Sequence, residues 1–190
     1  MDADGLATLA RTIRSLPPRA GSTAIVLIDG PSGSGKSTFA ERLAVASGAT
    51  VLAVEDMYPG WDGLEAAAQH VVEDVLEPLA RGEGASIRRW DWDRSVESGR
   101  EPVPAAAILI IEGVGAGSVA AGAYAGLLIW LDADDEQRYA RAMQRDGELF
   151  APHWERWAEQ ERRFHAREDT RARADLSFRT DQPGWDGARA

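Results

Sequence analysis

The stretch with the clearest chemical meaning runs from residue 28 to residue 38 and reads IDGPSGSGKST. Its spacing satisfies G-x-x-x-x-G-K-S/T, the pattern of a loop that holds phosphate groups. Glycines let the backbone wrap closely around an anion, and the first turn of the following helix adds partial positive charge. A glycine turn that only caps a helix is the alternative, but it has no need of a lysine. We predict a nucleotide site formed by Gly30, Ser32, Gly33, Ser34, Gly35, Lys36, Ser37 and Thr38.

Two side chains are predicted to bind Mg²⁺ beside this loop. The Ser37 hydroxyl occupies the position that binds the ion, and Lys36 is expected to reach the β- and γ-phosphates. Glu112 ends the apolar run AILIIE, where an acid holds Mg²⁺ directly or through water. The alternative for Glu112 is a helix cap or loop acid.

The sequence shows neither a guanine-reading N-K-x-D motif nor a transporter ATPase signature, which leaves small kinases that use ATP and Mg²⁺ as the leading class.

The segment EDMYPGWD, residues 55–62, is predicted to form the acceptor side of the site. Asp56 follows an apolar run, and ligands of parallel sheets bind at the carboxyl ends of the strands. A carboxylate there would accept the proton of a hydroxyl acceptor, a role worth about 10²- to 10⁴-fold in rate. The alternative is a capping Asp in a surface turn. Tyr58 and Asp62 are assigned to the same acceptor site.

Tryptophans and arginines extend this prediction. Trp90 and Asp91 could offer a stacking face and a hydroxyl acceptor to a ring-bearing substrate, although a tryptophan is more often a core or edge-strand residue.

Arg138, Arg141 and Arg145 fall within about 60° of arc on one helix. One interpretation pairs them with Asp134, Asp135 and Glu148 on a solvated face. The interpretation we favour makes Arg141 and Arg145 catalytic, in a lid of about residues 138–152 that closes over the γ-phosphate and excludes water.

The elements that must position these residues follow from hydropathy. Apolar runs at residues 23–29, 49–56, 107–113 and 126–132 predict strands of a parallel sheet buried on both faces. Helical spacing predicts an N-terminal helix ending before Pro17 and helices over 64–79, 134–146 and 153–172, with Asp62 as N-cap of the second and Pro78 ending or kinking it. We predict an α/β fold, a doubly wound parallel sheet with helices on both faces. The expected organisation is one domain over residues 1–190, with a loose tail after about residue 180.

Composition limits the class of partner. The net charge of -10 opposes a general affinity for nucleic acid or anionic lipid, because both are polyanions. The chain has no cysteine, and no run approaches the roughly 20 apolar residues of a membrane span. We therefore expect a cytoplasmic protein whose partners are ATP and a small-molecule acceptor, with no nucleic acid and no membrane.

With these residues in view, the chain resembles the uridine kinase-like family of P-loop kinases. GPSGSGKST looks like the family's phosphate loop, EDMY is similar to its D-x-F-Y segment, and WDW resembles its Y-D-F. IIEG matches its strand-end Glu-Gly, and RYARAMQRD is similar to its R-x-x-R-x-x-x-R-D lid. These pieces lie between about residues 24 and 146, in the order that the family has them.

The resemblance implies a P-loop NTPase fold with a helical lid and carries over Asp56 as the base, Lys36 and Ser37 on the phosphates and metal, and Arg141 and Arg145 in the lid. Trp61 and Asp62 resemble the Phe-Asp pair that holds ribose hydroxyls, at a shorter spacing from Asp56. The sequence departs from nucleoside-specific members at Ser95 and Glu97, which stand where these members have His and Arg.

The resulting hypothesis is a kinase that transfers the γ-phosphate of ATP to a hydroxyl of a small molecule, with a uridine- or cytidine-like nucleoside as the first candidate. Alternatives within the class are a sugar, vitamin precursor or antibiotic acceptor, and a cytidylate kinase-like enzyme, for which paired arginines to hold a monophosphate are not found. The alternative of another class is an ATP-dependent switch or binding module. The sequence gives no basis for an oligomeric state.

Overall fold

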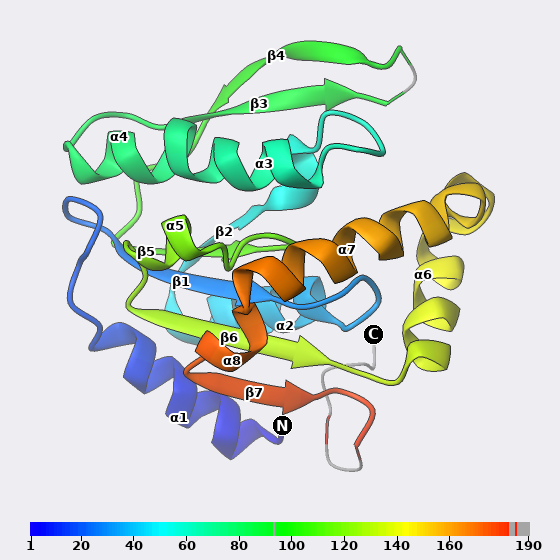
Figure 1. The fold of residues 1–190 in the computed structure, drawn as a ribbon. Helices are drawn as coiled ribbons and strands as arrows, with labels where there is room; N and C mark the ends of the chain where they lie inside the picture. The colour runs from blue at the N-terminus through cyan, green and yellow to red at the C-terminus, as the bar shows by residue number, and fades with distance from the viewer. Residues whose placement is uncertain (93, 183–184, 186–190) are drawn as a thin grey trace.

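A five-stranded parallel sheet forms the centre of the computed structural model, which describes residues 1–92, 94–182 and 185 (Figure 1). The strand order is β2-β5-β1-β6-β7. The bounds are Ala24–Asp29 for β1, Thr50–Ala53 for β2, Ile108–Glu112 for β5, Leu127–Asp132 for β6 and Leu176–Arg179 for β7. Four of these strands match the predicted apolar runs, whereas β7 was not predicted.

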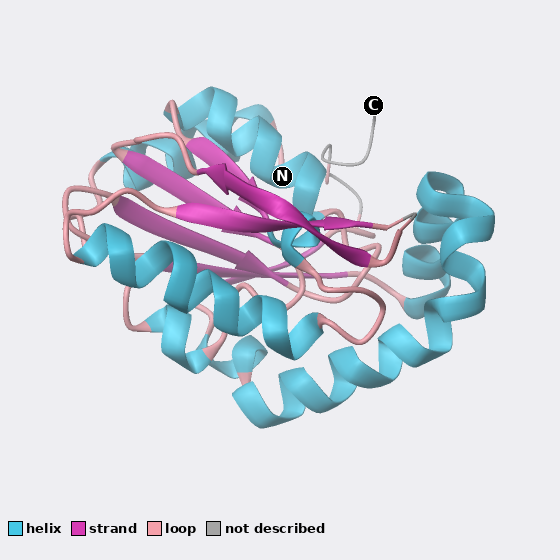
Figure 2. Cartoon of the chain, turned by 90° about the horizontal axis from the view of Figure 1, so that it is seen from above, coloured by secondary structure: helices cyan, strands magenta, loops and turns pink. Residues whose placement is uncertain are grey.

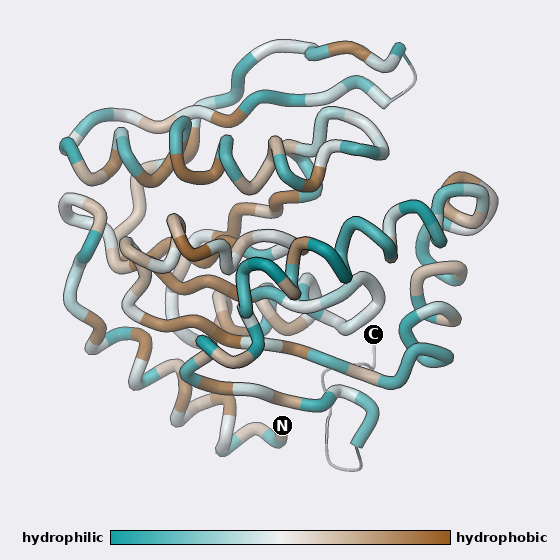
Figure 3. Tube along the Cα trace, in the orientation of Figure 1, coloured by the Kyte–Doolittle hydropathy of each residue, from teal (hydrophilic) through white to brown (hydrophobic). Residues whose placement is uncertain are grey.

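Helices cover both faces of the sheet (Figure 2). Every residue of β1 is buried, with Ile25 and Leu27 in one core and Val26 and Ile28 in the other. Two helices pack on the second face, α1 (Ala3–Arg14) and α2 (Lys36–Ser47). The predicted doubly wound α/β fold is therefore confirmed, and Figure 3 shows its apolar strands between more polar outer helices.

A long helical segment and a β-hairpin lie beyond the other face. The segment comprises α3 (Leu64–His70), a π-helical turn η2 (Val71–Leu76) and α4 (Glu77–Ala80). The helix predicted over 64–79 is present, but Asp62 is not its cap, because the N-cap position falls on Gly63 and no side chain caps the helix. Pro78 does not end the helix, which continues to Ala80, but the backbone departs from a regular α-helix just before it, in the π-helical turn η2.

The hairpin pairs β3 (Ser86–Asp91) with β4 (Val96–Pro102) in an antiparallel, separate sheet that was not predicted as such. The buried carboxylate of Asp74 anchors it to the helical segment, with Oδ2 at 2.8 Å from Arg88 Nε and Oδ1 at 3.0 Å from Arg100 Nη2. Ile87 of β3 is also buried in the apolar core, whereas β4 is exposed along its whole length and reaches the helical segment through the Arg100–Asp74 pair.

Two helices follow β6 and account for the predicted helices 134–146 and 153–172. Helix α6 (Asp135–Phe150) contains a break at Gly147, with φ 53° and ψ -129°. A short 3₁₀ turn, η3 (Ala151–His153), leads to α7 (Trp154–Glu168). Asp169, with φ 48°, separates α7 from α8 (Thr170–Arg173), so the second predicted helix is in fact two. Two further short elements are η1 (Val54–Met57) and α5 (Val119–Gly122).

The end of the described chain is attached to the sheet. Thr180 is buried and its N–H donates to the Asp132 carbonyl at 2.8 Å, and the Trp185 ring lies 5.3 Å from that of Phe39. The rest of the predicted loose tail, residues 183–184 and 186–190, lies outside the described residues. Among the described residues, no helix is both long and apolar enough to cross a bilayer.

Candidate active site

The predicted phosphate loop joins β1 to α2, as its mechanism requires. Gly30, Gly33 and Gly35 have φ of 146°, 76° and 87°, a region that side chains other than glycine rarely adopt. A Cβ at Gly30 would lie 2.0 Å from the Leu131 carbonyl oxygen, and one at Gly33 would lie 2.1 Å from that of Arg138. The loop is therefore wedged between the end of β6 and the first turns of α6, and only glycine fits both contacts.

Lys36 lies at the base of this loop. Its side chain is buried, and Nζ donates to the Pro31 carbonyl at 3.0 Å. Burial lowers the pKa of Lys36, while the charges of Glu112, Glu161 and Asp29 oppose that effect. The buried Ser34 hydroxyl has no hydrogen-bond partner in the described part of the chain, and Ser34 does not line the cavity described below.

Glu112, the last residue of β5, lies beside Ser37 in the first turn of α2. Glu112 pairs in register with Ile28 and is only 4% exposed. Burial raises the pKa of the Glu112 carboxyl, whereas the Lys36 charge and the Ser37 hydroxyl act in the opposite direction. Mg²⁺ is usually held by one or two carboxylates together with substrate phosphates and water, and one acid and one hydroxyl beside a phosphate loop fit that pattern. The described residues contain no cluster of three or more His, Asp or Glu that would form an all-protein metal cage.

A cavity of about 330 Å³ opens from the loop toward the hairpin and the α6–α7 corner. Ser32, Gly33, Lys36 and Ser37 line its phosphate end, with Glu112 beside them. Six aromatic rings line the remainder of the cavity: Tyr58, Trp61, Trp92, Phe150, His153 and Trp157, of which Trp157 reaches back to the phosphate end through its contact with Ser32. These rings come from separate segments and contact one another, with 4.2 Å between the stacked centroids of Trp61 and His153 and 4.9 Å between those of Trp61 and Trp92. A single hollow thus joins a polar end to an aromatic end, which we call the aromatic end below.

The two acids of the EDMY segment face different surroundings. Glu55, which was not predicted, lines the cavity, and its Oε1 lies 3.5 Å from Arg145 Nη2. Asp56, the predicted base, does not line it and pairs with Arg89 of the hairpin at 2.5 Å. Asp56 lines an adjoining hollow that it shares with Glu55, Ser37 and Glu112, so it lies near the same sheet edge. The motif held the signal for Glu55, because aligning D-x-F-Y on Tyr58 puts Glu55, not Asp56, at the acid position.

The other predicted acceptor residues divide in the same way. Tyr58 lines the cavity, and its hydroxyl donates to the Val114 carbonyl at 2.8 Å. Asp62 is outside the lining and pairs with Arg156 through two hydrogen bonds. Trp90 and Asp91 are outside it as well, and the Asp91 carboxylate instead accepts the Arg94 N–H at 3.0 Å in the hairpin turn. Trp92, two residues beyond Trp90, takes the place in the cavity that was predicted for Trp90.

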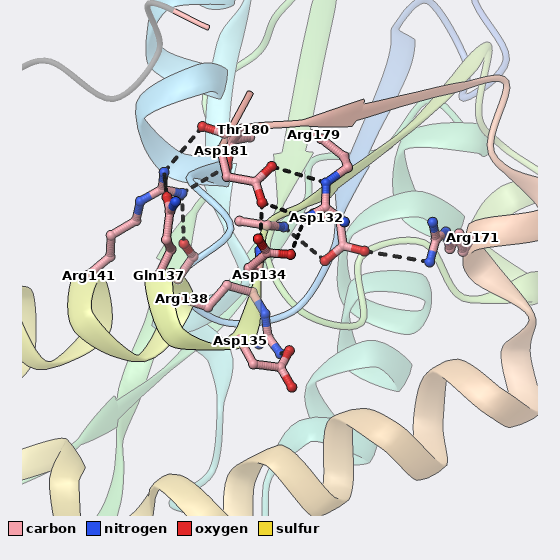
Figure 4. Close-up of polar contacts among 12 residues, drawn as sticks. Asp132, Asp134, Asp135, Gln137, Arg138, Arg141, Arg171, Arg179, Thr180 and Asp181 are labelled. Carbon is pink, nitrogen blue, oxygen red and sulfur yellow. Dashed lines mark hydrogen bonds and ion pairs between the residues drawn. The ribbon is translucent and has the colours of Figure 1, made fainter. Parts of the chain in front are cut away.

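The lid arginines do not act as one stripe. Arg145 lines the cavity and is held by hydrogen bonds to Asp146 at 2.6 and 2.9 Å. Arg141 is outside the cavity lining and donates to Thr180 Oγ1 at 2.8 Å and to the Gly33 carbonyl at 3.3 Å (Figure 4). Arg138 pairs with Asp135, as the solvated-face interpretation expected, but also donates to the Ser32 carbonyl at 3.2 Å. Arg138 and Arg141 therefore tie α6 to the back of the loop. The side chain of Glu148 lies outside what the structure describes.

Sequence reasoning missed the supports behind the loop. On α7, Trp157 Nε1 donates to Ser32 Oγ at 3.1 Å, and the buried Glu161 accepts the Ser32 N–H at 2.9 Å. Their spacing of four residues puts both on the face that carries Phe164, and this spacing was the available signal. Asp29 at the end of β1 is fully buried, and its carboxylate accepts the N–H groups of Gly30, Gly115 and Gly117 at 2.6, 3.1 and 2.8 Å. That residue thereby joins the phosphate loop to the loop that follows Glu112.

Comparison with known families supports this geometry. A family model described as "AAA domain" matches residues 26–151, about two thirds of the chain. The chain belongs to the AAA domain family. This AAA domain match extends from β1 to η3, so it includes the phosphate loop, Glu55, the hairpin, Glu112 and Arg145, whereas Trp157 and Glu161 lie beyond it.

Solved structures share the fold of this AAA domain. One, from Bacillus stearothermophilus, is described as a "Possible Uridine Kinase"; it is 19% identical, with a TM-score of 0.65, and the match covers 92% of this chain and 97% of that one. Another, from Silicibacter sp. TM1040, is described as a "putative fructose transport system kinase"; it is 21% identical, with a TM-score of 0.59 and coverage of 91% and 98%. A comparison with curated proteins gives no match. The resemblance to uridine kinase-like P-loop kinases is thus confirmed at the level of the fold.

Proposed function

We propose that this AAA domain is an ATP- and Mg²⁺-dependent phosphotransferase that moves the γ-phosphate to a hydroxyl group of a small molecule. One observation carries the proposal: a single cavity has the phosphate loop and Glu112 at one end and room lined by aromatic side chains at the other. A nucleotide switch needs the first end and has no use for the second. The kinase-like fold of the neighbouring structures agrees with the proposal.

The residues that line the cavity suggest how the γ-phosphate is transferred. The acceptor oxygen attacks the γ-phosphorus, the bond from that phosphorus to the β–γ bridging oxygen breaks, and ADP leaves with the electron pair. Lys36 neutralises charge on the phosphates, and Arg145 adds a second cation on the lid side. Mg²⁺, held by Ser37 and Glu112, would supply further charge neutralisation when bound. Most of the rate enhancement is expected from positioning and electrostatics, because phosphoryl transfer needs little covalent chemistry from the protein.

Glu55 is the base that the cavity supports. Its carboxylate shares the hollow with Lys36, whereas the Asp56 carboxylate is engaged by Arg89 outside the lining. A base must lie within hydrogen-bond reach of the hydroxyl proton that it accepts. We therefore assign proton acceptance to Glu55 and give Asp56, the residue proposed from sequence, the role of holding the hairpin through Arg89. The wall formed by Arg145, Phe150 and Trp157 would keep water from the γ-phosphate.

The acceptor is expected to be a ring-bearing alcohol, because the space beyond the γ-phosphate is walled by rings. A nucleoside remains one candidate and a non-nucleoside alcohol the other. Ser95 and Glu97, which replace the base-reading residues of nucleoside-specific relatives, are exposed and lie outside the cavity lining. This arrangement favours an acceptor that is not selected by the identity of a nucleobase.

The composition allows a direct test of nucleotide binding, since Lys36 is the sole lysine in the sequence. An acyl-phosphate derivative of ATP transfers its acyl group to a lysine beside the phosphates. We expect one label on Lys36, mapped by peptide mass spectrometry, and its loss when excess Mg-ATP competes. Labelling of the α-amino group alone, or labelling of Lys36 that ATP does not reduce, would contradict the proposed nucleotide site.

Phosphate transfer is then tested with γ-labelled ATP and a panel of alcohols. ATP hydrolysis that is stimulated by a protein and by none of the alcohols would favour a nucleotide-dependent switch.

A further inference from the structure

The side chains at the aromatic end of the cavity limit the shape and charge of the acceptor that can bind there. Trp61 is at its centre, stacked with His153 at an interplanar angle of 15° and with Phe150 at 14°. Tyr58 and Trp157 meet edge to face at 4.7 Å on the wall nearest the phosphate loop. Aromatic faces attract flat apolar groups and cations, because the π-system carries negative charge on its faces.

The charges along the cavity disfavour an anion at this end. Among the described lining residues, the cations are Lys36 and Arg145, and the acids are Glu55, Glu112 and Asp146. Arg145 is already hydrogen-bonded to Asp146 and lies 3.5 Å from Glu55. Lys36 is at the phosphate end, where it would meet ATP. Because Lys36 and Arg145 both serve the phosphates of ATP in the proposed reaction, a carboxylate or phosphate on the acceptor would meet no further lysine or arginine of the described lining and would be repelled by the acids, in a chain whose net charge is -10.

Two of the polar atoms on these rings are committed to the protein itself. The Tyr58 hydroxyl is bonded to the Val114 carbonyl, and the Trp157 indole N–H to Ser32 Oγ. The lining contains no Asn, Gln, Ser or Thr outside the phosphate loop among the described residues. Reading the edge of a heterocycle requires such groups, because discrimination comes from buried donors and acceptors left unpaired by the wrong ligand. Stacking on ring faces, by contrast, tolerates any flat ring.

From these observations we propose that the acceptor is an alcohol on a flat ring, neutral or positively charged, recognised through the faces of its ring and not through edge hydrogen bonds. This proposal rests on the proposed phosphotransferase function and narrows its substrate class. It separates the protein from kinases of phosphorylated or carboxylated acceptors, and it predicts that uridine and cytidine, if accepted, are accepted about equally.

Three matched probes isolate charge: benzyl alcohols carrying a para-aminomethyl, a para-methyl or a para-carboxylate group. Their affinities for the full chain saturated with Mg²⁺ and a non-hydrolysable ATP analogue are measured by calorimetry. We expect the carboxylate to bind about tenfold or more weaker than the methyl compound, and the amine to bind at least as well as the methyl compound. Uridine and cytidine form the second matched pair, since they have the same shape and opposite hydrogen-bonding patterns at one ring edge. We expect their phosphorylation efficiencies to agree within about tenfold.

Trp61→Leu tests the ring contact, with Trp185→Leu as the control because Trp185 packs on Phe39, away from the cavity. The first substitution should weaken the favoured probe about tenfold and leave ATP binding unchanged, and the second should change neither. Equal binding of the carboxylate, a hundredfold preference between uridine and cytidine, or no binding of any ring alcohol would overturn the inference. If the unsubstituted protein does not bind ATP at all, the proposed function itself is overturned. The two failures are therefore distinguishable.

Discussion

Replacing Glu55 by Gln removes the carboxylate that faces the cavity while keeping the shape of the side chain. A general base contributes about 10²- to 10⁴-fold, so we expect kcat to fall by that factor, a rise of about 3 to 5 kcal/mol in the activation free energy. ATP affinity should change little, because Arg145, the cation nearest Glu55, keeps its hydrogen bonds to Asp146.

Asp56→Asn is the matched control, because it makes the same chemical change on the adjacent residue. Asp56 pairs with Arg89 at 2.5 Å, but both side chains are about 40% exposed, at 42% and 37%. Exposed ion pairs contribute about 0–1 kcal/mol, so the hairpin should stay folded and kcat should fall by less than about tenfold. Arg89 also keeps its contact with Glu101 at 2.7 Å.

The assay is single-turnover transfer of γ-labelled phosphate to the best acceptor found in the panel, with ATP affinity measured separately by calorimetry. Single-turnover rates report the chemical step and are insensitive to product release. The assignment of the base to Glu55 is refuted if Asp56→Asn loses more activity than Glu55→Gln. Equal losses of a hundredfold in both variants would also refute it, because they would point to the hairpin and not to proton transfer.

Three further substitutions test the supports of the site. Asp29→Asn should lower the free energy of unfolding by about 2–3 kcal/mol and Tm by about 4–12 °C in calorimetry, because an amide N–H₂ would oppose backbone N–H donors; an unchanged Tm would contradict this. Trp157→Phe removes one indole N–H and should weaken ATP binding by about 2- to 12-fold in titrations, whereas unaltered affinity would show that this contact does not position the loop. The hydrogen bond from Arg179 holds the pKa of Asp181 below its ordinary 3.8, so Asp181 stabilises the fold above that pH and loses this effect as pH falls through the lowered value. Asp181→Asn should therefore lower Tm at pH 7 by an amount that shrinks below pH 3.8, and a difference that grows in acid would refute the sign.

The phosphate loop and the sheet could be predicted from the sequence because their causes are local. An unbroken apolar run needs burial on both faces, and Gly30, Gly33 and Gly35 permit the positive φ that the loop adopts at all three positions. The strand β7 and the hairpin were missed for the opposite reason. Strand β7 has alternating burial over four residues, and β4 is exposed throughout, so neither has the apolar run on which the prediction depended.

At the acceptor side, the structure differs from the prediction in the directions of the side chains. Glu55 and Asp56 are neighbours on the 3₁₀ turn η1, and which of them faces the cavity depends on how that turn leaves β2. Trp90 and Trp92 pose a related problem, because Trp90 lies on β3 whereas Trp92 lies beyond the end of that strand at Asp91, where strand alternation no longer fixes the direction of a side chain. Sequence spacing fixes which residues reach this edge of the sheet. Tertiary packing decides which of them point into the cavity.

The contacts of α6 and α7 also narrow the part of the chain that can act as a lid. Near its start, α6 rests on the phosphate loop, where the backbone of Arg138 leaves no room for a side chain at Gly33. Further on, α7 holds the loop again through the bonds of Trp157 and Glu161 to Ser32. A movement of the whole predicted lid, residues 138–152, would break the contacts between the start of α6 and Gly33. It would thereby disturb the loop that is proposed to bind the nucleotide. Between the two fixed points lies the non-helical Gly147. We therefore expect any closing motion to be confined to the corner around Gly147, where Arg145, Phe150 and His153 line the cavity, so that the acceptor side can open while the phosphate loop keeps its shape.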